Sequence, residues 1–89
     1  MVYTDVDISK SEVIRTFSEN IDEIELKWHR DQEDRIIESL SKSDWKIQLE
    51  NQLPVFINSP VHIKSGEWHR LIKGKNELTL KIIKNIEKD

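Results

Sequence analysis

Apolar and polar residues alternate along most of this chain from Ile21 onward, and this alternation constrains the fold more than any other feature. Successive side chains of a strand point to opposite sides, so a period of two is typical of strands with one buried face. Short segments rich in Ser, Asn, Gly and Pro separate the runs and favour turns. No helical crossover that could join parallel strands is apparent. The sequence therefore predicts an all-β sandwich or barrel, whose strands contain these apolar residues: Ile24, Leu26, Trp28, Trp45, Ile47, Leu49, Val55, Phe56, Ile57, Val61, Ile63, Leu78, Leu80 and Ile82.

The first twenty residues show a different pattern. Ser9 and Glu12 have the spacing of a capping box, and Val13, Ile14 and Phe17 would share one side of a helix. The sequence therefore predicts a leader over residues 1–20 with one short helix within residues 10–19, followed by a β body over residues 21–89.

Composition limits the class of protein. Eighty-nine residues are enough for one core, and a core this small favours self-association. The chain has no Cys, which excludes disulfides and thiolate metal sites. Its net charge of −3 argues against nucleic-acid binding. No signal peptide and no apolar run of membrane-spanning length is found, so we expect a cytoplasmic protein with no membrane partner.

The tripeptide Trp-His-Arg occurs twice, around His29 and around His69, although the chain has only three His residues. The second copy follows a turn predicted at Gly66. Imidazole is a common metal ligand, and a His placed after a turn is well positioned to reach a metal or ligand. We expect the two imidazoles to converge on one cavity.

The segment from Ile24 to Ile83 resembles the cupin family, small β-barrels of jelly-roll topology. The second cupin motif, G-x5-P-x-G-x2-H-x3-N, is matched at Gly66 and His69, whereas Asn58, Lys64 and Lys73 replace its first Gly, its Pro and its Asn. Asn tolerates the left-handed backbone that Gly adopts, so the replacement at position 58 is mild.

The first cupin motif, G-x5-H-x-H-x3,4-E-x6-G, is matched less well. His29 and Asp31 occupy the His-x-His positions, Arg35 replaces the Glu, and Lys42 replaces the closing Gly. The resemblance implies that His29, Asp31 and His69 are the metal ligands, with iron, manganese, nickel or zinc as the metal. A guanidinium cannot bind a cation, so Arg35 favours a degenerate, metal-free site in which it pairs with Asp31 or Asp34.

Two functions follow from this resemblance. The first is a non-catalytic module that binds a small molecule or forms a dimeric scaffold; the second is a metal-dependent oxygenase or isomerase acting on a small polar organic molecule. The residues proposed to contact a ligand are Arg35, Gln48, Trp28 and Trp68. A two-fold homodimer is expected through the outward-facing members of Val55, Phe56 and Ile57 or through the strand at residues 78–83.

Overall fold

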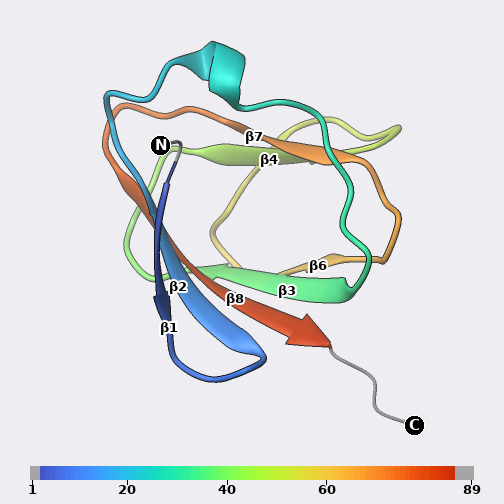
Figure 1. The fold of residues 1–89 in the computed structure, drawn as a ribbon. Coiled ribbons are helices and arrows are strands. Elements are labelled where there is room, and N and C mark those ends of the chain that lie inside the picture. The colour runs from blue at the N-terminus through green and yellow to red at the C-terminus, as the bar shows by residue number, and fades with distance from the viewer. Residues whose placement is uncertain (1–2, 86–89) are drawn as a thin grey trace, which may run out of the picture.

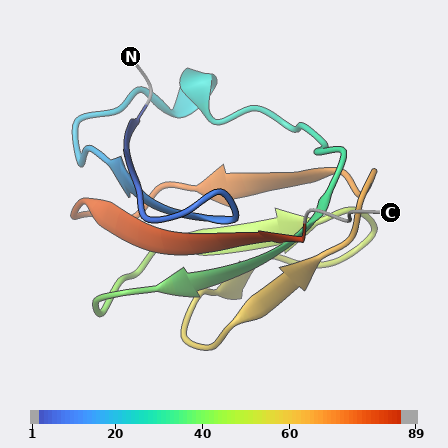
Figure 2. The ribbon, with the colours of Figure 1, turned by 60° about the horizontal axis from the view of Figure 1, so that its bottom comes forward.

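The computed structural model describes residues 3–85 and shows two antiparallel sheets packed against each other (Figures 1 and 2). The five-stranded sheet has the order β1-β2-β8-β3-β6, and the three-stranded sheet has the order β5-β4-β7. The elements are β1 (Thr4–Asp7), β2 (Glu12–Phe17), the one-turn 3-10 helix η1 (Glu23–Glu25), β3 (Asp34–Ser39), β4 (Lys46–Leu49), β5 (Val55–Phe56), β6 (Val61–Ile63), β7 (His69–Ile72) and β8 (Leu78–Asn85). The predicted all-β architecture is confirmed.

The core lies between the two sheets. Apolar residues alternate with outward-facing residues along β4 and β8, as the period of two predicts. Trp45, directly before β4, is fully buried, and its ring lies 5.8 Å from that of Phe17 on β2. The buried apolar residues are Val13, Phe17, Ile21, Ile37, Trp45, Ile47, Ile57, Ile63, Leu78, Leu80 and Ile82.

The predicted N-terminal helix is wrong, because residues 12–17 form strand β2. All six of these residues pair with β8, from Glu12 opposite Ile83 to Phe17 opposite Leu78. Ser9 does not cap a helix: Ile8 and Ser9 donate backbone hydrogen bonds to the Glu12 carbonyl in the β1–β2 turn. Val, Ile and Thr favour extended backbone, and hydrogen bonds to β8 satisfy the backbone N–H and C=O groups of this segment.

No helix within residues 3–85 has the length and apolar character needed to cross a bilayer.

A second correction concerns residues 24–28, which were expected to form a strand. Residues 24 and 25 belong to η1, and the irregular backbone that follows runs beside β7 of the three-stranded sheet (Figure 1). The Asp22 carboxylate accepts from the Ile24 backbone N–H and caps this turn, and Ile24 is 72% exposed. A local cap therefore replaces strand pairing at this point.

The expected dimer contacts differ in exposure. Val55 and Phe56 are about half exposed on β5, an edge strand. Strand β8 is hydrogen-bonded on both sides, to β2 and β3, and offers no free edge. The two-fold dimer stays a prediction, and the exposure of the edge strand favours β5 as its contact.

Gly74 lies where a side chain would not fit. A Cβ atom at this position would collide with the Asp44 carboxylate and would lie 2.7 Å from Cδ1 of Trp45. The same carboxylate accepts the Lys75 backbone N–H at 2.9 Å, so it is not free to move away.

We therefore expect Gly74→Ala to destabilise the fold by about 1 to 3 kcal/mol through overpacking. Thermal denaturation should show a melting temperature lower by roughly 5 to 15 °C. Gly66→Ala is a useful comparison, because Gly66 has open space around it and only its positive φ of 78° opposes a side chain. An unchanged melting temperature in Gly74→Ala would contradict the collision.

Candidate metal centre

His29 and His69 meet across an antiparallel bridge between the β2–β3 connection and the start of β7. Each donates its backbone N–H to the other's carbonyl, at 3.0 and 2.9 Å. The centroids of the two imidazoles lie 4.2 Å apart, and both rings line the same cavity. The expected convergence of the two Trp-His-Arg copies is confirmed.

The Gly66 turn positions His69, as the sequence predicted. Glu67 donates its backbone N–H to the Lys64 carbonyl, which closes a β-turn with Gly66 at φ 78°, a value that favours glycine. The Gly66 N–H in turn donates to the Asp31 carbonyl at 2.8 Å. This contact ties the turn before β7 to the segment that carries the third candidate ligand.

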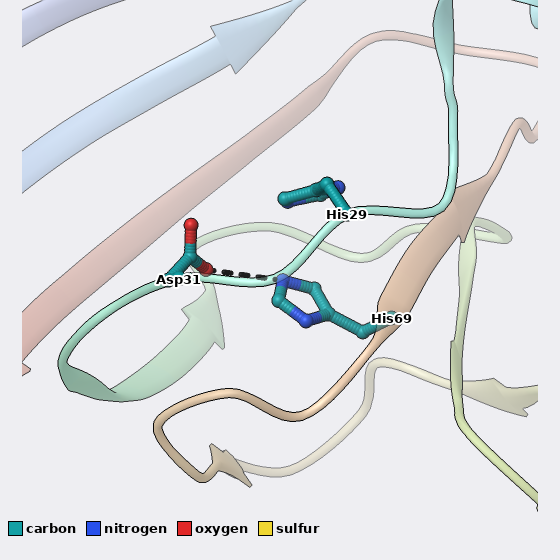
Figure 3. Close-up of side chains that lie close together, drawn as sticks. All are labelled: His29, Asp31 and His69. Carbon is teal, nitrogen blue, oxygen red and sulfur yellow. Dashed lines mark ion pairs between the residues drawn. The ribbon is translucent and has the colours of Figure 1, made fainter.

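Asp31 completes a cluster with the two His residues (Figure 3). Its Oδ2 atom lies 3.2 Å from Nε2 of His69, and one potential ligand atom from each of the three residues lies within 4.8 Å of the others. Asp31 Oδ2 is buried and accepts no hydrogen bond from the residues that the structure describes. A buried carboxylate oxygen without a hydrogen-bond donor is costly, and the Arg35 guanidinium, whose Nε lies 3.5 Å away, compensates its charge only in part.

Backbone carbonyls fix the tautomers of both imidazoles. Nδ1 of His29 lies 3.0 Å from the Lys27 carbonyl, and Nδ1 of His69 lies 2.8 Å from the Glu67 carbonyl. A carbonyl only accepts, so each Nδ1 carries the hydrogen and each Nε2 keeps its lone pair when the ring is neutral. This is the arrangement in which a carbonyl orients an imidazole as a metal ligand.

The protonation state of His69 follows from its burial. Burial lowers the pKa of His69, and the neighbouring His29 lowers it further, against the opposing hydrogen bond to Glu67 and the charge of Asp31. The lowered pKa favours the neutral form of His69 at pH 7, in which Nε2 carries no proton to donate to Asp31. In that form two electron-pair donors face each other at 3.2 Å, an arrangement that a shared cation could satisfy.

Arg35 contacts the carboxylates rather than replacing a ligand. Its Nε lies 3.5 Å from Asp31 Oδ2, and its guanidinium donates to Glu33 Oε1 at 2.9 Å. Burial raises the pKa of Glu33, but the Arg35 hydrogen bond and charge lower it more, so the net shift is downward. The pairing with Asp31 that was expected for a metal-free site is observed. The expected pairing with Asp34 is not observed, because the Asp34 carboxylate accepts from the Ser65 backbone N–H.

The three-residue cluster lines a cavity of about 350 Å³ between the two sheets. The remaining walls are mainly apolar: Phe17, Leu26, Ile37, Ile47, Ile63, Leu71, Leu80 and Ile82. Arg15 also lines this cavity and was missed by the sequence analysis. Had residues 12–17 been interpreted as a strand, the two-residue spacing of Val13, Arg15 and Phe17 would have placed Arg15 on the inner face.

Arg15 is held in place by two neighbours. It donates to both oxygens of Asp5, its partner in the β1–β2 ladder, and its guanidinium lies 3.8 Å from the Tyr3 ring centroid. The hydrogen bond from Arg15 lowers the pKa of Asp5, which outweighs the opposing effect of burial. The cavity therefore has two fixed guanidinium groups, those of Arg15 and Arg35.

Three other proposed ligand contacts lie elsewhere. Gln48, Trp28 and Trp68 do not line the cavity. Gln48 accepts from Arg70 and donates to the Gln52 carbonyl. The two indoles lie on the opposite side of the bridge from the imidazoles, because neighbouring side chains of an extended segment point in opposite directions. Their predicted role in this cavity is not supported by their positions.

No family model and no curated protein matches the chain. Solved structures do match it. A proposed mannose-6-phosphate isomerase from Ralstonia eutropha JMP134 shares 14% identity at a TM-score of 0.66, covering 97% of this chain and 84% of its own. KdgF from Halomonas sp. shares 11% identity at a TM-score of 0.65, with coverages of 96% and 80%. A cupin domain from Bordetella pertussis Tohama I shares 11% identity at a TM-score of 0.56, with coverages of 96% and 93%. At such low identities these matches establish architecture only, and on that basis the chain has a cupin-like fold.

Proposed function

We propose that this chain is a small cupin-like protein that binds one divalent transition metal through His29, Asp31 and His69, and a small polar organic molecule in the adjoining cavity. One observation carries the proposal: the buried Asp31 Oδ2 accepts no hydrogen bond from residues 3–85 and lies 3.2 Å from Nε2 of His69, the ring nitrogen that does not face the Glu67 carbonyl. A metal ion would satisfy both atoms.

The donor set fits such an ion. Two imidazoles and one carboxylate suit iron, manganese, nickel or zinc and are the set found in facial sites. Ligands on neighbouring positions of one such metal are about 3 Å apart, given bond lengths near 2.1 Å. The separation of 3.2 Å between His69 Nε2 and Asp31 Oδ2 is close to this value. When bound, the metal would supply Lewis acidity, which polarises a carbonyl or acid group of the ligand.

The cavity walls suit a small molecule with an apolar body and a negatively charged or strongly polar end. Apolar side chains form most of the surface, while Arg15, Lys27 and Arg35 lie among the lining residues. A guanidinium can donate two parallel hydrogen bonds to a carboxylate or phosphate. In this proposal Arg15 and Arg35 orient the ligand, and the apolar walls exclude water around it.

A second candidate function is catalysis by the same centre, as an isomerase or oxygenase. Three protein ligands leave coordination positions for substrate or water, which a catalytic metal site needs. One of the similar structures is itself a proposed isomerase. Arg35 stands where the cupin motif has a carboxylate ligand, so catalysis would have to proceed with three protein ligands.

Calorimetric titration with zinc and with manganese tests the proposed function. We expect wild type to bind one ion per chain. Arg35→Glu should bind at least about tenfold more tightly, because it removes a positive charge beside Asp31 and adds a carboxylate.

Arg35→Gln separates these two effects, because it removes the charge without adding a carboxylate ligand. Its affinity should lie between those of wild type and Arg35→Glu. Lys42→Gln, an exposed change outside the cavity, should match wild type. Failure of both wild type and Arg35→Glu to bind either ion would reject the metal site.

A further inference from the structure

The outer face of the three-stranded sheet carries aromatic rings paired with cations. Arg70 lies 4.9 Å from the Trp28 ring centroid, and Arg30 lies 5.1 Å from that of Trp68. Lys46 lies 4.7 Å from the Phe56 ring on the neighbouring strands β4 and β5. We call these six residues, Trp28, Arg30, Lys46, Phe56, Trp68 and Arg70, the cation–π face.

The register places these residues on one side of the sheet. Lys46 is followed by Gln48 on the same side of β4, and Gln48 pairs with Arg70 of β7. The His29–His69 bridge then sets Trp28 opposite Arg70 and Arg30 opposite Trp68. The cation–π face is thus the reverse side of the bridge that carries the metal ligands.

The charge of this face differs from that of the whole protein. The chain has a net charge of −3, yet none of the three cations of the face has a carboxylate within 4 Å among residues 3–85. The other two arginines of the chain, Arg15 and Arg35, each form an ion pair. Glu50 borders the face, and it accepts from the Trp68 backbone N–H. The cation–π face is therefore locally positive, with guanidinium groups free to bind further oxyanions.

The side chains of the face are also partly fixed before any partner binds. Stacking on an indole restrains a guanidinium while leaving N–H groups at its edge to donate, and Arg70 is held further by its hydrogen bond to Gln48 at 2.9 Å. Trp28 and Trp68 are 41% and 42% exposed. Trp and Arg are the residue types most enriched among the strongest contacts of protein interfaces.

We propose that the cation–π face binds an extended acidic segment of a partner polypeptide, with carboxylates two residues apart. Arg30 and Arg70 are diagonal neighbours across the bridge, a relation that separates side chains by about 7 to 8 Å. Alternate residues of an extended peptide lie about 6.6 to 6.8 Å apart on one side, which matches this spacing. The intervening side chains of the peptide would point away from the face.

The width of the face supports a linear partner. Three strands spaced about 4.8 Å apart, with one further segment beyond β7, span only about 15 Å. A stable contact between two globular surfaces buries about 800 Å² of each partner, whereas an extended peptide needs only a narrow strip. One extended segment fits on it.

The test is fluorescence anisotropy with a labelled peptide in which glutamate alternates with valine. Arg30→Gln and Arg70→Gln should each weaken binding about tenfold, and the double variant about 100-fold. Arg30 is exposed, so its replacement does not threaten the fold. Lys42→Gln removes the same charge elsewhere and should bind like wild type. A peptide with glutamine in place of glutamate should not bind.

Nuclear magnetic resonance locates the contact. The indole N–H signals of Trp28 and Trp68 should shift on peptide addition, while that of Trp45, which is fully buried, should not. Asp31→Asn should leave peptide affinity unchanged, so this proposal can fail or succeed independently of the metal site. Loss of peptide binding in Asp31→Asn would mean that the peptide occupies the cavity, and would overturn the proposal.

Other occupants give different results. Equal affinity for oligothymidylate or heparin of the same charge would show a general polyanion surface and would also overturn the proposal. Sedimentation on wild type and Arg30→Gln covers the remaining case. A wild-type dimer that dissociates in Arg30→Gln would show that the face contacts a second copy of this chain instead.

Discussion

Trp45→Ala is expected to lower the free energy of unfolding by about 4 kcal/mol. Trp45 is fully buried, packs on Phe17, and donates its indole N–H to the Asn76 carbonyl. Truncation removes the apolar contacts and leaves a cavity between the sheets. A domain of 89 residues has a total stability of roughly 4 to 13 kcal/mol, so the loss is a large part of the whole.

Urea denaturation followed by circular dichroism measures this effect. Trp45→Phe should lose roughly half as much, because it keeps most of the apolar volume but cannot donate to Asn76. Trp68→Ala is the matched control: Trp68 is 42% exposed, and its loss should cost less than about 1 kcal/mol. Equal losses in Trp45→Ala and Trp68→Ala would mean that burial at position 45 does not determine stability.

The all-β architecture was predictable because strand periodicity is a local property of the sequence. Trp45, Ile47 and Leu49 alternate with Lys46 and Gln48, and β4 follows this alternation. The N-terminal segment was not predictable in this way. Ser9 and Glu12 have capping-box spacing, but residues 12–17 pair with β8 more than sixty positions away, and this pairing has no signature in the local sequence.

The candidate site was only partly predictable. The resemblance to cupin motifs predicted that His29, Asp31 and His69 lie close together, and they do. Motif spacing allows this prediction because it reflects which residues meet in the folded barrel, whereas periodicity reports only which side of a strand a residue faces. Arg15 was missed because the segment that carries it was interpreted as a helix. Trp28 and Trp68 were proposed as ligand contacts, although strand alternation around His29 and His69 predicts that the flanking Trp and Arg side chains point away from the imidazoles.

Asp31→Asn should weaken metal binding but raise the stability of the metal-free protein. These opposite responses would distinguish a metal ligand from a carboxylate with a purely structural role. An amide oxygen is a much weaker transition-metal ligand than a carboxylate, so zinc affinity should fall by at least about 100-fold. The metal-free variant should nevertheless be more stable than metal-free wild type by about 1 kcal/mol. The new amide N–H would donate to Nε2 of His69, which now faces an acceptor at 3.2 Å.

Arg35 would retain its hydrogen bond to Glu33 at 2.9 Å in this variant, so its charge stays paired. The measurement is urea denaturation with chelator and with zinc, at a pH above about 6.5. Above this pH the imidazole of His69 is mainly neutral in both the folded and the unfolded protein. Because folding lowers the pKa of His69, the unfolded protein takes up the proton first as the pH falls, and the free energy of unfolding decreases until the pH passes the folded pKa. His69→Gln is the comparison, since it should lose zinc binding without gaining stability. If Asp31→Asn instead destabilises the metal-free protein by more than about 1 kcal/mol, Asp31 serves mainly as the partner of Arg35, and the cluster is structural.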